Sequence, residues 1–132
     1  MTTQPLPPGA VTTAALVWQD ICALEDLPQD AGVAALLDLG ARGTRQIALF
    51  RIGDSEQVHA IANLDPFSQA NVLGRGILCQ IQGEPAVASP VLKQHFRLRD
   101  GRCVEDETVA VDVFPVRLCN GRVEVAVEEG RG

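Results

Sequence analysis

The sequence contains few side chains that could serve as nucleophiles or metal ligands, and they are widely spaced. The thiols and imidazoles belong to Cys22, Cys79, Cys103, Cys119, His59 and His95. Zinc sites and redox pairs usually place two cysteines two residues apart, and no such pair occurs in this sequence. We expect reduced cysteines that behave as small apolar residues in or near a core, and histidines that are half-buried or at the surface. A zinc, disulfide or displaced metal site is the alternative.

Hydroxyl nucleophiles are the next possibility, because Ser68 and Ser89 both lie in segments without a regular apolar period. A catalytic serine needs a base nearby, and neither serine has a His, Asp or Glu at an obviously activating spacing. Asp65 is close to Ser68 in sequence, but an Asx turn that supports the loop explains this acid more simply. The glycine patterns of dinucleotide and P-loop sites are also absent. The sequence therefore indicates a non-catalytic chain.

The net charge of the chain indicates which classes of partner it can bind. The 132-residue chain has room for one domain and carries 17 acidic against 11 basic residues, a formal net charge of −6. Nucleic acids and anionic membranes attract basic surfaces, so neither is an expected partner. No apolar run approaches the roughly 20 residues of a membrane span, and the first residues do not resemble a secretion signal. We expect a cytoplasmic protein that meets proteins or small molecules.

Short apolar or alternating segments bounded by turn residues indicate the elements that must position these side chains. Strands are expected over residues 31–40, 44–52, 57–63, both arms of 77–90, 95–104 and both arms of 109–127. The "GARG" segment (40–43) and the Asn120–Gly121 pair predict hairpin turns. An amphipathic helix over 31–39 is the competing interpretation, because Ala and Leu favour helix.

The pattern as a whole predicts an all-β fold. Residues 64–76 and 89–94 have no clear period and are expected to be loops. About nine short antiparallel strands without a long helix are typical of a sandwich or small barrel. We expect this domain over residues 17–128, with a flexible leader over 1–16 and a tail over 129–132.

Two loops separated by a β-hairpin resemble the cluster-binding part of the Rieske family. The matching segments are "NVLGRG" (71–76), "ILCQIQGEPAVAS" (77–89) and "SPVLKQHFRLRDGRCV" (89–104). In Rieske domains these loops supply Cys-x-His and Cys-x-x-His to a [2Fe–2S] cluster. The resemblance places the four ligand positions of this chain at Pro66, Ser68, Ser89 and Leu92. Pro and Leu cannot ligate iron and Ser is a poor substitute for a thiolate, so the site is expected to be degenerate.

Two longer segments carry a more specific resemblance. "NLDPFSQANVLGRG" (63–76) and "ASPVLKQHFRLRDGRCVEDE" (88–107) are similar to the small subunit of the cytoplasmic assimilatory NAD(P)H-dependent nitrite reductase, a Rieske-like family that typically lacks the cluster ligands. The resemblance implies a large-subunit partner that holds FAD, siroheme and a [4Fe–4S] cluster and reduces nitrite to ammonium with NAD(P)H. This chain would bind that partner and hold no cofactor itself.

The loop tips are the expected docking surface. The candidate contacts are Phe67, Leu73, Arg75, Val91, Leu92 and Lys93. Apolar residues beside a cation are typical of interface hot spots. The alternative is that Phe67 and Leu92 fold inward and fill the space that a cluster would occupy. Two other functions fit less well: a Rieske-type ferredoxin with unorthodox ligands, and a β-module that binds another oxidoreductase or a small ligand.

Overall fold

The computed structural model describes residues 15–128 as twelve short strands and three short 3₁₀ helices. The strands are β1 (Leu16–Ala23), β2 (Gly32–Asp38), β3 (Thr44–Arg51), β4 (Val58–Ala62), β5 (Leu64–Asp65), β6 (Ala70–Asn71), β7 (Ile77–Ile81), β8 (Glu84–Ala88), β9 (His95–Arg97), β10 (Val113–Phe114), β11 (Val116–Cys119) and β12 (Arg122–Glu128). The 3₁₀ helices are η1 (Leu24–Asp26), η2 (Gly40–Arg42) and η3 (Leu73–Arg75). The expected leader, apart from its last two residues, and the expected tail lie outside the described residues.

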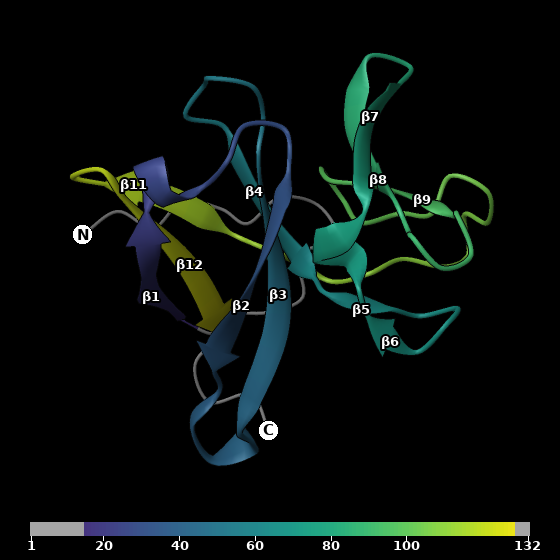
Figure 1. Cartoon of the computed structure of the whole chain (residues 1–132). Coiled ribbons are helices and arrows are strands. Elements are labelled where there is room, and N and C mark those ends of the chain that lie inside the picture. Colours follow the sequence, from purple (N-terminus) through teal and green to yellow (C-terminus); the bar gives the residue numbers. More distant parts are fainter. Residues whose placement is uncertain (1–14, 129–132) are drawn as a thin grey trace, which may run out of the picture.

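The strands form two halves (Figure 1). The larger half contains a sheet of order β1-β12-β11 and a sheet of order β10-β4-β3-β2. The smaller half is inserted between β4 and β10 and contains the β7-β8-β9 sheet and the β5-β6 pair. All strand pairs within these sheets are antiparallel, so the predicted all-β class is confirmed.

Strand β3 joins the two halves because both of its faces are buried. Ile47 and Leu49 enter the core that lies against β12, whereas Ala48 and Phe50 enter the core of the smaller half. Successive side chains of a strand point to opposite faces, so one continuous apolar run can serve two cores. The smaller half is therefore fixed on the larger one by packing as well as by chain connections.

The structure confirms the predicted hairpins and rejects the helix over 31–39. β2 pairs with β3 in register from Gly32↔Phe50 to Asp38↔Thr44, and β4 pairs with β3. The Asn120–Gly121 turn has φ values of 51° and 77°, as a two-residue hairpin turn of this kind requires. Burial alternates from residue to residue along this segment, with Leu36 60% exposed and Leu37 fully buried, which is the two-residue period of a strand and not the 3.6-residue period of a helix.

The structure has more strands than the expected nine, and one of them, β1, pairs with β12 although no strand was predicted over residues 16–23. Part of the segment expected to be a loop pairs briefly as β5 and β6. The strand expected after residue 109 is divided at Pro115 into β10, which pairs with β4, and β11, which pairs with β12. Proline lacks the N–H that a ladder needs, so it marks the change of sheet. No helix in residues 15–128 is long and apolar enough to cross a membrane.

Candidate functional site

Two loops of the smaller half lie side by side at the position where the sequence analysis placed a degenerate cluster site. Loop 1 is residues 65–76 and loop 2 is residues 89–94. The Ser89 hydroxyl donates a hydrogen bond of 2.5 Å to Asp65 Oδ2, and both residues are fully buried. This bond joins the start of loop 1 to the start of loop 2.

The Asp65 carboxylate also organises its own loop. Its Oδ1 accepts the Phe67 N–H at 2.9 Å, which confirms the predicted Asx turn, and its carbonyl oxygen accepts the Gln69 N–H at 2.7 Å. Burial raises the pKa of Asp65, but hydrogen bonds from the Ser89 hydroxyl and the Phe67 N–H outweigh it, so the net pKa is lowered. Asp65 is thus a buried carboxylate held ionised by donors from both loops.

Loop 2 is closed on itself around Ser89. The Ser89 N–H donates to the Gln94 carbonyl at 2.8 Å, and the Lys93 N–H donates to the Ser89 carbonyl at 3.1 Å. Lys93 has a φ of +69°, in the left-handed region that side chains other than glycine rarely adopt. The turn therefore presents Val91 and Leu92 at its tip, where they are 47% and 51% exposed.

The residues at the four ligand positions do not fit a [2Fe–2S] cluster. Pro66 and Leu92 offer no donor atom, and the Ser89 hydroxyl is committed to Asp65. Ser68 Oγ is buried and lowers the Asp65 pKa, but its geometry leaves it without a hydrogen-bond partner among the described residues. Iron in these clusters is held by thiolates and imidazoles, and none occupies these positions. The chemistry of the donor set thus argues for a site without a cluster.

The apolar residues of the two loops differ in their burial. Phe67 is half-buried and its ring lies 6.2 Å from the Phe96 ring, at the edge of the smaller core. Leu92 points outward instead. Leu73 is fully buried, which corrects its place among the docking candidates, because its side chain packs in that core and cannot reach a partner.

Cys22, Cys79 and Cys119 lie on the separate strands β1, β7 and β11, Cys103 lies between β9 and β10, and none of the four forms a disulfide. Burial raises the pKa of Cys22, Cys79 and Cys103, so these thiols are not activated as thiolates. Glu105 accepts the His95 N–H at 2.8 Å and pairs with His95 Nδ1 at 2.6 Å, which holds the first residue of β9, directly after loop 2. Within residues 15–128, no group of three or more His, Cys, Asp or Glu is placed to hold a metal ion.

His59 is half-buried, as the sequence analysis expected, and burial lowers its pKa. Its Nε2 lies 2.9 Å from Gln57 Nε2. Since the amide nitrogen can only donate, His59 Nε2 acts as the acceptor of a neutral ring. His59 lies on β4 and Gln57 directly before it, and neither residue belongs to loop 1 or loop 2.

Asn63 is a positioning residue that the sequence analysis recorded without a role. Its Oδ1 accepts the Gly74 N–H at 2.6 Å, its carbonyl accepts the Leu73 N–H at 3.0 Å, and its Nδ2 donates to Gln46 Oε1 at 3.0 Å. These bonds hold η3 against the β2–β3 sheet. In the sequence, Asn63 could have been singled out because it is the first residue of the "NLDPF" segment, directly before Leu64 and Asp65.

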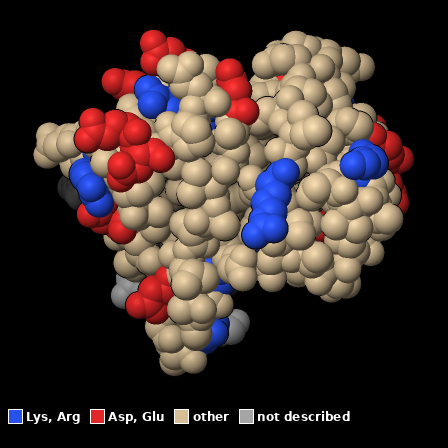
Figure 2. Space-filling view, in the orientation of Figure 1, with Lys and Arg blue, Asp and Glu red and all other residues tan. Residues whose placement is uncertain are grey.

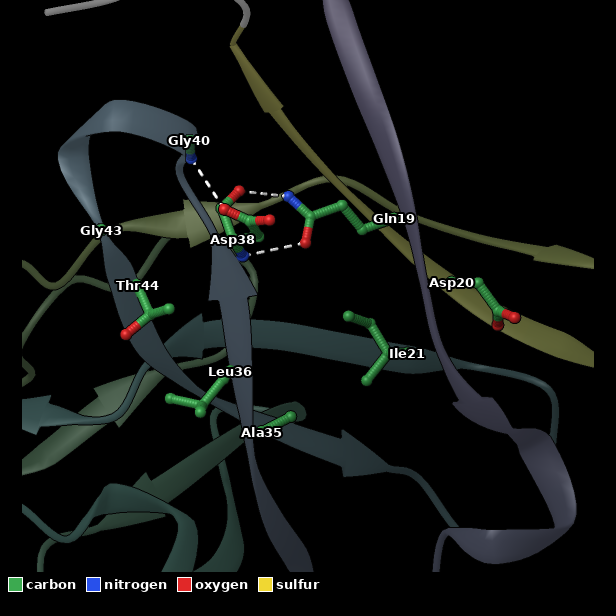
Figure 3. A pocket seen from close by; sticks show the side chains of 9 residues that line it. All are labelled: Gln19, Asp20, Ile21, Ala35, Leu36, Asp38, Gly40, Gly43 and Thr44. Carbon is green, nitrogen blue, oxygen red and sulfur yellow. Dashed lines mark hydrogen bonds between the residues drawn. The ribbon is translucent and has the colours of Figure 1, made fainter.

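A groove lies where the edge strands β1 and β2 meet, away from the two loops (Figure 3). The Gln19 side chain crosses it, donating to the Asp38 carbonyl at 2.6 Å and accepting the Asp38 N–H at 2.9 Å. An amide that bonds both backbone groups of an edge residue substitutes for a neighbouring strand. Gln19 therefore protects the end of β2 from pairing with another chain.

Comparison with known proteins gives one consistent family. The model of the Rieske-like [2Fe-2S] domain matches residues 17–126. The nitrite reductase (NADH) small subunit of Escherichia coli K12 is 46% identical over 108 residues, 82% of this chain and 95% of that protein. The crystal structure of the NADH-dependent nitrite reductase small subunit from Mycobacterium tuberculosis superimposes with a TM-score of 0.78 at 46% identity, covering 86% of this chain and 96% of that one.

One relative has a different architecture. A Klebsiella oxytoca protein named nitrite reductase [NAD(P)H] large subunit is 51% identical over 112 residues, which are 85% of this chain. The matched segment is only 11% of the length of that protein. A domain of this kind therefore occurs both as a separate chain and as a small part of a much longer one.

Proposed function

This chain belongs to the Rieske-like family of nitrite reductase small subunits, and from that premise we propose that it is an accessory subunit that docks on the large subunit of an NAD(P)H-dependent nitrite reductase. The observation that carries the proposal is the Klebsiella protein, in which a similar segment lies within a chain named as a large subunit. Covalent fusion keeps such a domain beside the rest of that chain. A separate chain reaches the same position by binding.

The residues at the ligand positions indicate how the redox chemistry is divided between the two subunits. In the proposed complex the large subunit holds FAD, siroheme and a [4Fe–4S] cluster, and it carries electrons from NAD(P)H to nitrite, which becomes ammonium. This chain contributes no redox group. Its loops 1 and 2 are held together by the Ser89–Asp65 hydrogen bond in place of ligands to iron, so the pair of loops is a rigid protein surface. A preformed surface binds with less loss of conformational entropy than a mobile one.

The docking surface proposed from the loops comprises Val91, Leu92 and Lys93, with the exposed edge of Phe67 and with Arg75 at its side. Val91 and Leu92 place two adjacent apolar side chains at the loop tip, where a partner surface can bury them. The proposal also includes a cytoplasmic location, where NAD(P)H is available. Fractionation of cells that express the chain tests this location directly.

Binding to the separately purified large subunit tests the docking proposal. We expect Leu92→Asp to weaken the complex at least tenfold, because a charge would enter an apolar contact. Val17→Asp on β1 is the matched control, since Val17 is similarly exposed at 40% but lies in the larger half. Absence of any complex with the wild-type chain, together with unchanged nitrite reduction when the chain is omitted, would reject the function.

Iron and sulfide analysis of anaerobically purified protein tests the cofactor part of the proposal. We expect colourless protein without stoichiometric iron, since none of the four ligand positions carries Cys or His. A reddish-brown protein with two irons per chain would instead make it a ferredoxin-like electron carrier.

A further inference from the structure

The Arg75 side chain has no hydrogen bond or ion pair among the described residues, although its backbone N–H donates to the Val72 carbonyl at 2.9 Å. Arg75 lies on η3 and is exposed. Four other exposed or half-exposed arginines are paired with acids, namely Arg45 with Asp112, Arg99 with Glu84, Arg117 with Glu124 and Arg122 with Asp20. The guanidinium of Arg75 therefore keeps its full capacity to donate.

The backbone beneath Arg75 is fixed by close packing. A Cβ atom on Gly32 of β2 would clash with the Gly74 carbonyl oxygen, so only glycine permits η3 to approach β2 this closely. The Asn63 side chain holds the Gly74 N–H from the other side. The Cα of Arg75 is thus held in one position, although nothing in residues 15–128 restrains its side chain.

Three large exposed apolar side chains belong to chain segments next to η3. Ile77 begins β7 two residues after Arg75 and is 72% exposed. Leu64 follows Asn63 and is 39% exposed. Leu36 on β2 is paired with Gln46 on β3, and the Gln46 side chain accepts a hydrogen bond from the Asn63 amide. Figure 2 shows charged groups around the edges of this face, while its middle, over β2 and η3, is uncharged apart from one basic group. We call Leu36, Leu64, Arg75 and Ile77 the η3 face.

We propose that the η3 face receives a carboxylate side chain of the large subunit, bound by Arg75 and enclosed by the three apolar residues. The proposal rests on the docking function proposed above and extends its surface from the loop tips across η3. An arginine pairs with a carboxylate through two parallel hydrogen bonds, which gain strength when neighbouring apolar contacts exclude water. Apolar contributions from three separate elements favour a protein surface over a small anion, which would touch the guanidinium alone.

The chain as a whole carries a formal charge of −6, which strengthens the assignment. The net negative charge repels an acidic group of a partner over most of the surface. Such a group is attracted to Arg75, whose surroundings carry no other charge. The η3 face therefore sets the orientation of docking. Leu36, Leu64 and Ile77 were not singled out by the sequence analysis, because their exposure depends on which strands cover them.

Charge reversal at Arg75 tests the proposal with the complete chain and the purified large subunit. We expect Arg75→Glu to raise the Kd at least tenfold and Ile77→Ser to raise it severalfold. Arg42→Glu is the matched control, because Arg42 is also an exposed arginine on a 3₁₀ helix but lies at the far end of the β2–β3 hairpin. Its Kd is expected to stay within twofold of the wild type. Arg75→Gln should also make the Kd less sensitive to salt.

The outcomes separate the two proposals. Equal binding of the wild type, Arg75→Glu and Arg42→Glu would overturn the η3 face and leave the docking function standing. Failure of the wild-type chain to bind would reject the docking function itself. Sedimentation of the chain alone is the second measurement: if Arg75→Glu dissolves a self-associated form, the occupant is another copy of this chain and the proposal is wrong. Circular dichroism checks that each variant is folded.

Discussion

The Ser89 hydroxyl lies 2.5 Å from Asp65 Oδ2, and this contact connects residues that are 24 positions apart in the sequence. Both side chains are fully buried at the junction of loops 1 and 2. In a cluster-bearing Rieske domain, ligands from both loops hold the iron and thereby hold the loops together. Here a hydrogen bond to a carboxylate makes the connection between the loops.

Removal of the Ser89 hydroxyl should destabilise the protein. Ser89→Ala leaves a buried carboxylate without one of its donors, and the Val91 N–H loses an acceptor at 3.3 Å. We expect the free energy of unfolding to fall by about 1–3 kcal/mol, measured by urea denaturation. Ser68→Ala is the matched control in loop 1. Ser68 Oγ makes no hydrogen bond among the described residues, whereas the Ser89 hydroxyl donates to Asp65 at 2.5 Å, so Ser68→Ala should cost less than Ser89→Ala.

A double-mutant cycle with Asp65→Asn isolates the bond itself. If the Ser89–Asp65 pair is energetically coupled, the losses of the single variants will not add, and the coupling energy will be about 0.5–3 kcal/mol. Additive losses would show that the two residues stabilise the loops independently.

The pH dependence of stability should reveal Asp65. Its folded pKa is lowered below the ordinary value of 3.8, so the folded state favours the ionised form. The resulting stabilisation is complete above the unfolded pKa and is lost as the pH falls through the folded pKa. Unfolding free energies measured from pH 7 to pH 2 should therefore decline more steeply below about pH 4 in the wild type than in Asp65→Asn. Glu105 has a lowered pKa as well, so part of the decline will remain.

The left-handed backbone at Lys93 allows stability and binding to be separated. A non-glycine residue at a φ of +69° costs roughly 1–2 kcal/mol, partly offset by the roughly 0.5–1 kcal/mol that glycine costs in entropy. Lys93→Gly should thus raise the unfolding free energy by up to about 1 kcal/mol. If Lys93 contacts the large subunit, the same variant will bind more weakly.

Gln82 provides the control for this experiment, because it has a φ of +54° in the β7–β8 turn and is not among the proposed contacts. Gln82→Gly should change stability in the same direction and leave the Kd unchanged. Equal weakening of binding by both glycine variants would show that the effect is not specific to the Lys93 side chain.

Gly76 tests how closely the two loops must approach. A Cβ atom there would clash with the Ala88 carbonyl oxygen and lie 2.6 Å from Val87 Cγ2, directly before loop 2. The backbone at Gly76 is extended, with φ −73° and ψ 172°, so Ala is disfavoured by the clash alone. Gly76→Ala should cost about 1–3 kcal/mol in thermal or urea unfolding. Gly74→Ala, whose Cβ would lie 3.2 Å from Asn63 Oδ1, should cost less.

Local sequence determined the turns and the absence of cluster ligands. The Asn120–Gly121 hairpin was predictable because these two residues tolerate positive φ, and the Asp65 Asx turn because its partner, the Phe67 N–H, is two residues away. The lack of donors at Pro66 and Leu92 is a property of the residues themselves and needs no fold. Such features depend on a few neighbouring residues and can therefore be predicted from the local sequence.

Only the tertiary structure decided which side chains face inward and which distant groups meet. Leu73 and Leu92 are chemically alike and both lie in predicted loops, yet Leu73 is fully buried and Leu92 is 51% exposed. The difference arises because η3 is held on β2 through Gly32 and Gly74, whereas loop 2 turns outward at Lys93. The hydrogen bond between Ser89 and Asp65 likewise depends on the tertiary placement of the two loops. Burial and long-range pairing depend on how sheets far apart in the sequence are packed, and the spacing of residues does not encode that arrangement.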